Sequence, residues 1–259
     1  MLLAQKVVLV SGVGPGLGRS VALACAREGA RVALAARNRE YLEEVAGEIS
    51  LRGGQAVALP ADIASSSACT DLVEAVIDKF GRIDVLVNNA FRGGVEPRFE
   101  EVDLQQWREV FEVNVFGSLQ LTQSVVPHMR KQGGGSIIFV NSMSARVIEP
   151  GMGGYAASKG ALLIAARTLA KELGPYGIRV NSIVPGYIWS EKLAGYFRWL
   201  AKQQNRTFEE VRDDIASRTC LNHIPDSDEV ADTVVFFASD LSRAVTGQAL
   251  DVNAGHYFD

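Results

Sequence analysis

The chain has 259 residues, of which 47% are hydrophobic and 22% charged, and its formal net charge is −4. This composition is typical of a globular protein and excludes collagen-like, coiled-coil and disordered chains. A mildly acidic chain without a run of Lys and Arg is a poor candidate for binding nucleic acid or an anionic membrane. We therefore expect neither partner.

Three cysteines, Cys25, Cys69 and Cys220, lie far apart and include no CxxC pair. This pattern favours reduced thiols in a cytosolic protein over a disulfide framework. The three histidines are also scattered, and no Cys/His cluster has metal-ligand spacing, so we predict no metal site. No apolar run has the length of a membrane span and the first residues lack signal-peptide organisation, which favours a cytoplasmic location.

Short apolar runs alternate with longer segments of helical periodicity. Several runs are apolar throughout, as expected for strands buried on both faces of a parallel sheet. The predicted strands are Val7–Val10, Arg31–Ala36, Gln55–Leu59, Asp84–Asn88, Ser136–Asn141, Arg179–Val184 and Ala249–Val252. The predicted helices are Leu17–Glu28, Arg39–Leu51, Ser66–Phe80, Leu104–Met129, Tyr155–Leu173 and Ser227–Ala238. Without a linker, we predict a single α/β domain over residues 1–259, a Rossmann-like doubly wound parallel sheet with helices on both faces.

Residues 187–223 interrupt this alternation. The segment follows a predicted strand but has the pattern of helices and loop. Its aromatic residues are Tyr187, Trp189, Tyr196, Phe197 and Trp199. Because ligands of open α/β sheets bind beyond the carboxyl ends of the strands, the segment is a candidate lid over an apolar substrate. Core packing or a subunit contact is the alternative.

A glycine-rich turn, Ser11-Gly-Val-Gly-Pro-Gly-Leu-Gly18, joins the first predicted strand to the first helix. Glycines permit a tight turn and the close approach of a pyrophosphate, which the helix N-terminus attracts through its free N–H groups and its dipole. The spacing of Gly12, Gly16 and Gly18 does not fit GxGxxG. Its place between the first strand and a helix nevertheless favours a dinucleotide-binding turn.

The end of the second predicted strand bears on the choice of cofactor. It reads Ala35-Ala36-Arg37-Asn38-Arg39, with no acid before Glu40. A carboxylate here would select NAD and repel a 2′-phosphate, whereas Arg37 and Arg39 can pair with that phosphate. This favours NADP(H). The alternative is that both arginines are solvated and that NAD(H) binds through other contacts.

Tyr155 and Lys159 lie four residues apart at the start of a predicted helix, so their side chains share one helix face. A phenol has a pKa near 10 in water, and a neighbouring ammonium favours the phenolate. The pair is therefore a candidate acid/base at neutral pH.

Further motifs occur in a fixed order around this pair. They are Asp62-Ile63 after the third strand, Asn88-Asn89-Ala90 at the end of the fourth, Asn114 in a helix, Ser142 before Tyr155, and Pro185-Gly186 after the sixth strand. With the turn Ser11–Gly18, which resembles TGxxxGxG with Ser11 in place of Thr, they cover essentially the whole chain. The sequence therefore resembles the short-chain dehydrogenase/reductase family in its short single-domain form.

The resemblance implies a role for each matching residue. Tyr155 would exchange a proton with the substrate oxygen, Ser142 would hydrogen-bond the same oxygen, and Lys159 would lower the pKa of Tyr155 and hold the nicotinamide ribose. Asn114 would hold a water that relays protons to Lys159. The implied cofactor-binding residues are Ser11, Gly12, Gly16, Leu17, Gly18, Arg37, Asp62, Ile63, Asn89, Ala90, Tyr155, Lys159, Pro185, Gly186 and Ile188. The family also implies a homodimer or homotetramer.

Two positions depart from the family pattern. Phe91 stands where a glycine usually follows Asn88-Asn89-Ala90, and Ser190 is the candidate for the position of a Thr that faces the nicotinamide carboxamide. The predicted function is a nicotinamide-dependent oxidoreductase, with NADP(H) favoured, that interconverts a secondary alcohol and a ketone on an apolar small molecule. The alternatives are reduction of an acyl-thioester ketone or an activated C=C bond, and a dinucleotide-sensing regulator without catalysis.

Overall fold

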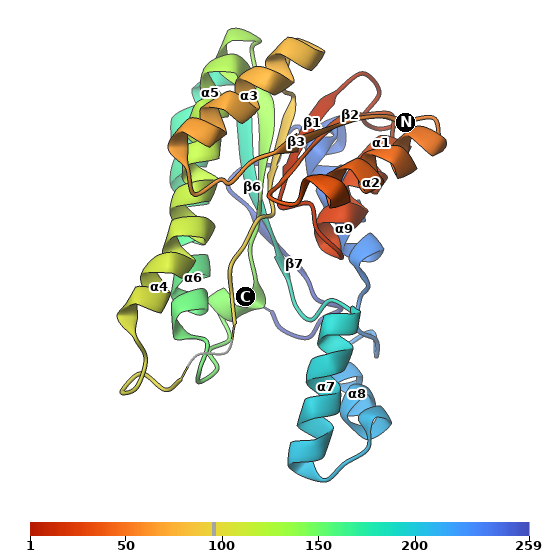
Figure 1. Ribbon diagram of the computed structural model, residues 1–259, viewed down its shortest axis with the longest axis vertical. Helices are drawn as coiled ribbons and strands as arrows, with labels where there is room; N and C mark the ends of the chain where they lie inside the picture. Colours follow the sequence, from red (N-terminus) through yellow and green to blue (C-terminus); the bar gives the residue numbers. More distant parts are fainter. Residues whose placement is uncertain (95–96, 259) are drawn as a thin grey trace.

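Seven strands form one parallel sheet in the computed structural model, which describes residues 1–94 and 97–258 (Figure 1). They are β1 (Val7–Ser11), β2 (Arg31–Ala36), β3 (Gln55–Pro60), β4 (Val85–Asn88), β5 (Gly135–Val140), β6 (Ile178–Pro185) and β7 (Ala249–Val252). The order across the sheet is β3-β2-β1-β4-β5-β6-β7. The chain thus winds outwards in two directions from β1 and β4, and the crevice at such a switch point is where ligands bind. The predicted doubly wound sheet is confirmed.

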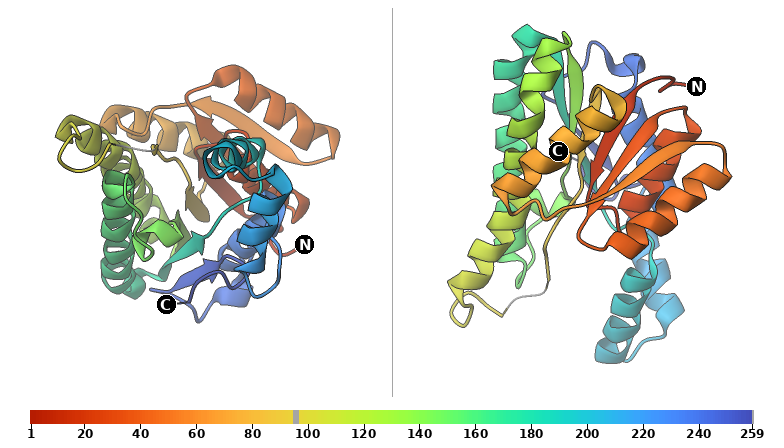
Figure 2. Two further views of the ribbon diagram at one scale, coloured as in Figure 1. Left: turned by 90° about the horizontal axis from the view of Figure 1, so that it is seen from below. Right: turned by 45° about the horizontal axis from the view of Figure 1, so that its top comes forward.

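Helices cover both faces of the sheet (Figures 1 and 2). They are α1 (Leu17–Arg27), α2 (Arg39–Leu51), α3 (Ser66–Phe80), α4 (Leu104–Phe111), α5 (Ser118–Lys131), α6 (Gly153–Leu173), α7 (Glu191–Gln204), α8 (Phe208–Ser217) and α9 (Ser227–Ala238). Helices α1, α2 and α9 pack on one face, and α3, α5 and α6 pack on the other. Both faces are therefore dry, which accounts for strands that are apolar along their whole length.

The alternation of side chains along β1 shows how the two cores divide. Val8 and Val10 belong to the cluster under α1, α2 and α9, whereas Val7 and Leu9 belong to the cluster under α3, α5 and α6. All four side chains are completely buried. Because successive strand residues point to opposite faces, one short apolar run supplies both cores.

The predicted single helix Leu104–Met129 is wrong in one respect. The segment Glu112–Gly117 is a π-helical turn between α4 and α5. A Cβ on Gly117 would lie 3.0 Å from the Ile63 side chain, so glycine lets this turn approach the loop after β3. Wide turns of this kind inside α-helices occur frequently at functional sites, and Asn114 lies in the middle of this one.

Helices α7 and α8 extend beyond the carboxyl edge of the sheet (Figures 1 and 2). They pack on each other through a small apolar cluster of Phe197, Ala201, Val211 and Ile215. Thr207 and Glu210 form a reciprocal capping box that begins α8. The segment is therefore helical, as predicted, and its role as a lid remains a prediction.

The three cysteines are free thiols in different surroundings. Burial raises the pKa of Cys25 to about 12 and that of Cys69 to about 11, whereas Cys220 is exposed. Among residues 1–94 and 97–258, no group of three or more His, Cys, Asp or Glu side chains is arranged to hold a metal ion. Within the same residues, every helix is too short or too polar to cross a bilayer.

Candidate active site and cofactor cleft

A cleft of about 710 Å³ opens at the carboxyl ends of β1, β2, β3 and β4. Six of the predicted cofactor residues line it: Gly12, Arg37, Asp62, Ile63, Asn89 and Ala90. They come from four separate loops of the chain, and the topology alone brings them together. The cleft lies where a doubly wound sheet binds a dinucleotide.

Two glycines of the turn, Gly12 and Gly18, lie where a side chain would clash. Gly12 has a φ of +77°, and a Cβ there would lie 2.4 Å from the backbone of Ala90. A Cβ on Gly18 would lie 2.3 Å from the carbonyl oxygen of Gly12. The same carbonyl accepts a hydrogen bond from Nδ2 of Asn89 at 2.8 Å. The turn is therefore packed tightly against the loop after β4, with its bare backbone facing the cleft.

The other predicted residues of the turn support it. The Ser11 hydroxyl, fully buried, donates to the carbonyl of Val87 and so joins β1 to β4. Gly16 is the N-cap of α1 with a φ of +105°, and Leu17 packs against the core. A Cβ on Gly14 would meet open space, so the middle of the turn leaves room beside the helix N-terminus. These features fit the pyrophosphate of a dinucleotide.

The two arginines after β2 have different surroundings. Arg37 is exposed, lines the cleft, and has no ion pair within the described residues. Arg39 stands outside the cleft lining and lies 3.7 Å from the Glu43 carboxylate. Asn38 accepts the backbone N–H of Tyr41 as the N-cap of α2. Of the two predicted arginines, Arg37 is therefore the one placed to meet a cofactor.

Tyr155 and Lys159 lie together at the start of α6. The Lys159 ammonium is 5.6 Å from the centre of the Tyr155 ring, and it donates to the carbonyl of Val140 at 2.8 Å. Ser142 comes two residues after the end of β5, and its side chain hydrogen-bonds with Tyr155. The predicted trio is thus brought together, because the segment that follows Ser142 packs against α6.

The expected lowering of the Tyr155 pKa is absent from this structure. Burial raises the pKa of Tyr155 above its ordinary value, and only the bond with Ser142 opposes this effect. Burial also lowers the pKa of Lys159 from 10.5 to about 8. The charge of Lys159 was expected to lower the pKa of Tyr155. Burial instead disfavours the charged form of both side chains, and this desolvation determines the direction of both pKa shifts.

Asn114 is fully buried and holds the loop beyond β4. Its Oδ1 accepts the N–H of Arg92 at 2.7 Å, and its Nδ2 donates to the carbonyl of Arg92 and to the Ser158 hydroxyl, each at 2.9 Å. Ser158 precedes Lys159 on α6. Asn114 therefore joins the π-helical turn, the cleft loop and the helix that carries Tyr155.

Phe91 lies over the predicted catalytic pair. Its ring packs edge-on against Tyr155 at 6.3 Å and lies 6.0 Å from the Lys159 ammonium. The ring lines the cleft and remains 55% exposed. The departure from the family glycine thus places an aromatic ring in the cleft wall, in contact with Tyr155.

The residues at the end of β6 and after it either pack against neighbouring segments or cap α7. Gly186 packs closely on the backbone of Asn253, and a Cβ there would lie 3.5 Å from the sulfur of Met143, next to Ser142. Pro185 ends β6 and Ile188 packs against the core. Ser190 is the N-cap of α7, accepting the N–H of Leu193 at 3.2 Å. The Ser190 hydroxyl is thus engaged in capping.

Lys192 is a cleft residue that the sequence analysis missed. It lies in the first turn of α7, is exposed, and lines the same cleft as the glycine turn. No motif indicates its role, because α7 follows β6 and the glycine turn follows β1. Among the described residues its ammonium has no ion pair.

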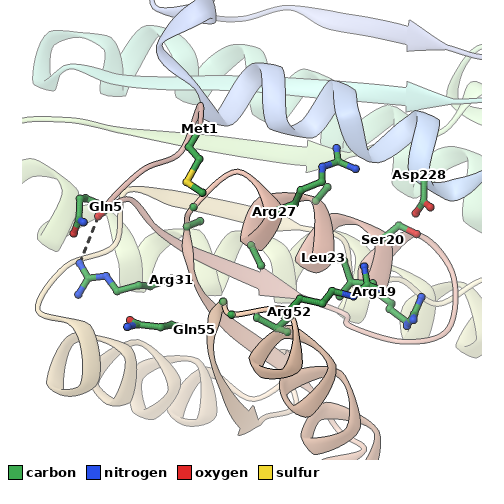
Figure 3. A pocket seen from close by; sticks show the side chains of 17 residues that line it. Met1, Gln5, Arg19, Ser20, Leu23, Arg27, Arg31, Arg52, Gln55 and Asp228 are labelled. Carbon is green, nitrogen blue, oxygen red and sulfur yellow. Dashed lines mark hydrogen bonds between the residues drawn. The ribbon is translucent and has the colours of Figure 1, made fainter.

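A second hollow, of about 560 Å³, lies near the amino ends of β2 and β3 and beside α1 (Figure 3). Four arginines face it, but carboxylates hold three of them: Glu48 pairs with Arg19 and Arg52, and Asp232 pairs with Arg27. The fourth, Arg31, donates to the carbonyl of Gln5. This hollow is at the wrong end of the sheet for a ligand of this fold, and we assign it no function.

Comparisons with known proteins agree with this arrangement. The family model described as enoyl-(acyl carrier protein) reductase matches residues 12–257. A 3-oxoacyl-acyl-carrier-protein reductase of Staphylococcus epidermidis is 33% identical, over 98% of this chain and 99% of its own length. An uncharacterized oxidoreductase of Methylorubrum extorquens is 36% identical, over 96% of this chain and 97% of its own.

A solved structure extends the comparison to three dimensions. A 7α-hydroxysteroid dehydrogenase in complex with NADH and 7-oxo glycochenodeoxycholic acid superimposes with a TM-score of 0.89. It is 34% identical, over 98% of this chain and 94% of its own. The similarity in sequence and in fold thus extends over nearly the whole of both chains. The chain belongs to the short-chain dehydrogenase/reductase family of NAD(P)-dependent oxidoreductases.

Proposed function

We propose that the protein interconverts a secondary alcohol and a ketone with NADP(H) as the cofactor. The observation that carries this proposal is the cluster of Ser142, Tyr155 and Lys159 beside the cleft. The cleft fits the cofactor, because bare glycine backbone faces the space where a pyrophosphate would lie. When bound, the nicotinamide cofactor would supply or accept the hydride.

Each residue of the cluster has a distinct task in this proposal. Tyr155 gives a proton to the carbonyl oxygen during reduction, or takes it from the alcohol during oxidation. Ser142 hydrogen-bonds the same oxygen and stabilises the charge that develops there. Lys159 holds the nicotinamide ribose with its ammonium, which lies 5.6 Å from the centre of the Tyr155 ring. Asn114 fixes the loop at the cleft and holds a water that passes protons to Lys159.

An absorbance assay that follows the reduced nicotinamide tests the proposal. The protein is supplied in turn with NADPH and NADH and with a panel of ketones, enones and acyl-thioester ketones. We expect the ketones to be reduced. Acyl-thioester ketones are the second candidate substrates, because the Staphylococcus epidermidis relative is named a 3-oxoacyl-acyl-carrier-protein reductase. The enones are included because the family description names an enoyl reductase, which acts on a C=C bond. Binding of the cofactor without turnover of any of the three classes would leave the dinucleotide-sensing regulator as the explanation.

Arg37 is the proposed determinant of the preference for NADP(H). The Arg37→Asp variant should lower the ratio of kcat/KM for NADPH to that for NADH on the order of 100-fold, because it removes a partner of the 2′-phosphate and adds a repelling charge. Steady-state kinetics with both cofactors measures the ratio. Arg39→Gln is the matched control, because Arg39 does not line the cleft; an unchanged ratio in Arg37→Asp would remove Arg37 from the argument.

Lys192 should attract the phosphates of the cofactor from the lid side of the cleft. The Lys192→Gln variant is expected to weaken NADPH binding about fivefold, an effect that shrinks at high salt because the exposed charge is screened. Titration calorimetry at low and high salt measures this. Lys202→Gln on the same helix is the control, because Lys202 is exposed and stands outside the cleft lining. Equal affinities for the two variants would show that Lys192 has no such role.

The oligomeric state and compartment belong to the same proposal. A homodimer or homotetramer is supported by exposed apolar side chains on the π-helical turn and on α6, where Phe116 is 51% and Ile164 is 60% exposed. Light scattering on the purified protein tests this, and a monomer at micromolar concentration would contradict it. The free thiols Cys25 and Cys69 support a reducing compartment such as the cytoplasm.

A further inference from the structure

A third cavity, of about 440 Å³, lies between the loop after β5, helices α7 and α8, and the segment of His256 and Tyr257. Met143, which follows Ser142, forms part of its wall, and so does Tyr187, which follows Gly186. Two wall residues of the cavity are thus the immediate sequence neighbours of Ser142 and Gly186, and no residue of the glycine turn lines it. The non-reacting part of a substrate held at Ser142 and Tyr155 would extend into it.

Aromatic rings form one wall of this cavity. Tyr187 stacks on His256 with ring centres 5.8 Å apart, and Phe197 supports its edge at 6.0 Å. Tyr196, also in the wall, stacks on Trp199 at 5.9 Å. The rings are thus held in place by their neighbours. Faces of this type bind apolar groups and also attract ammonium groups through the ring quadrupole.

The charged side chains in the cavity wall differ in their pairing. Asp214 lies 2.7 Å from the Arg218 guanidinium, and Arg206, which stands outside the wall, lies 3.4 Å from the same carboxylate. Glu149 also lines the cavity, is exposed, and has no ion pair among the described residues. The Glu149 carboxylate can therefore pair with a cation bound beside the aromatic wall.

Glu149 is close enough to both wall tyrosines to act on them. Burial raises the pKa of Tyr187 to about 12, with further contributions from Glu149 and Tyr196, while Arg218 opposes them. Burial raises the pKa of Tyr196 as well, and Glu149 adds to it. A carboxylate that disfavours a phenolate at these two positions favours a cation at the same place.

We propose that the substrate is an alcohol or ketone bearing an ammonium group, which binds between Tyr187, Tyr196 and Glu149. This inference rests on the proposed oxidoreductase activity and specifies its substrate class. Substrates with a carboxylate in the same position meet Glu149 and are disfavoured. This preference for a cation is opposite in sign to that expected of an enzyme that binds a carboxylic acid, such as the 7α-hydroxysteroid dehydrogenase in complex with 7-oxo glycochenodeoxycholic acid.

Three ketones of similar shape test the proposal. Each is a cyclohexanone with one substituent on the ring carbon opposite the carbonyl: a tert-butyl group, a trimethylammonium group or a carboxylate. We expect kcat/KM to be about tenfold higher for the trimethylammonium compound than for the tert-butyl compound, and lowest for the carboxylate. In Glu149→Gln the advantage of the cation should fall to about threefold or less. Glu191→Gln is the control for net charge, because Glu191 lies on α7 outside the cavity wall and pairs with Arg198.

Titration of the trimethylammonium compound into the protein with NADPH present separates this inference from the proposed activity. Binding that weakens in Glu149→Gln, with no turnover of any ketone, would uphold the cation site and refute the reaction. Turnover of all three ketones at equal kcat/KM, or a preference for the carboxylate, would refute the cation site and leave the reaction intact. The cation site would also be refuted if Glu149→Gln kept the full preference for the trimethylammonium compound over the tert-butyl compound.

Discussion

Replacing Tyr155 with phenylalanine is expected to lower kcat about 1,000-fold, because the reaction loses the group that exchanges a proton with the substrate oxygen. Phenylalanine keeps the ring that packs against Phe91 and removes only the hydroxyl that bonds with Ser142. The affinity for NADPH should therefore stay within about twofold of the wild type. Steady-state kinetics gives the first quantity and calorimetric titration gives the second.

Tyr176→Phe is the control for this variant. Tyr176 lies at the end of the α6 region, where its ring stacks on the Arg130 guanidinium at 3.8 Å, far from the cleft. It should keep full activity. Full activity in Tyr155→Phe as well would refute the catalytic assignment, whereas a joint loss of activity and of NADPH affinity would point to a disturbed cleft.

Lys159→Met is expected to have the second largest effect, with kcat/KM lowered at least about 100-fold. The variant also reports on stability, because the buried ammonium has a pKa of about 8 in the folded protein against 10.5 ordinarily. Between these values the unfolded chain binds more protons than the folded one, so stability rises with pH. The wild type should gain up to about 3 kcal/mol across this window relative to Lys159→Met.

Urea unfolding of both proteins at several pH values measures this gain. The difference in unfolding free energy between the two proteins removes the contributions of other titrating groups. The buried thiols of Cys25 and Cys69 are such groups, and their raised pKa values make stability fall as the pH rises. A difference that stays constant from neutral pH to the ordinary lysine pKa would contradict the lowered pKa of Lys159. The reduction rate of the wild type should likewise fall above about pH 8, as the ammonium is lost.

Much of the fold follows from local sequence patterns. The run Val7–Val10 is apolar at each position, and a strand that must face two helix layers needs this property. The break at Asn114 does not follow from such patterns, because the apolar periodicity of residues 104–129 continues on both sides of the π-helical turn. One extra residue in a turn changes the helix geometry without changing the composition.

The site was predictable where neighbours in sequence are neighbours in space. Tyr155 and Lys159 share a helix face, and Gly12 and Gly18 belong to one turn. Distant residues such as Asp62 and Ser142 were predicted only because they match family motifs, and residues that no motif marks were not predictable. Lys192 reaches the cleft from α7, and Tyr187 meets His256 across sixty-nine positions of sequence. The directions of the pKa shifts of Tyr155 and Lys159 could not be predicted from the sequence either, because they depend on how deeply the two side chains are buried in the folded chain.

The single accessible thiol offers a practical probe. At neutral pH the buried Cys25 and Cys69 are shielded and protonated, so a maleimide dye should attach selectively to Cys220. Cys220 comes just after α8, within the proposed lid segment of residues 187–223 and before α9. A fluorophore on the natural sequence can therefore report any movement of this segment when nucleotide or ketone is added, with no engineered label site.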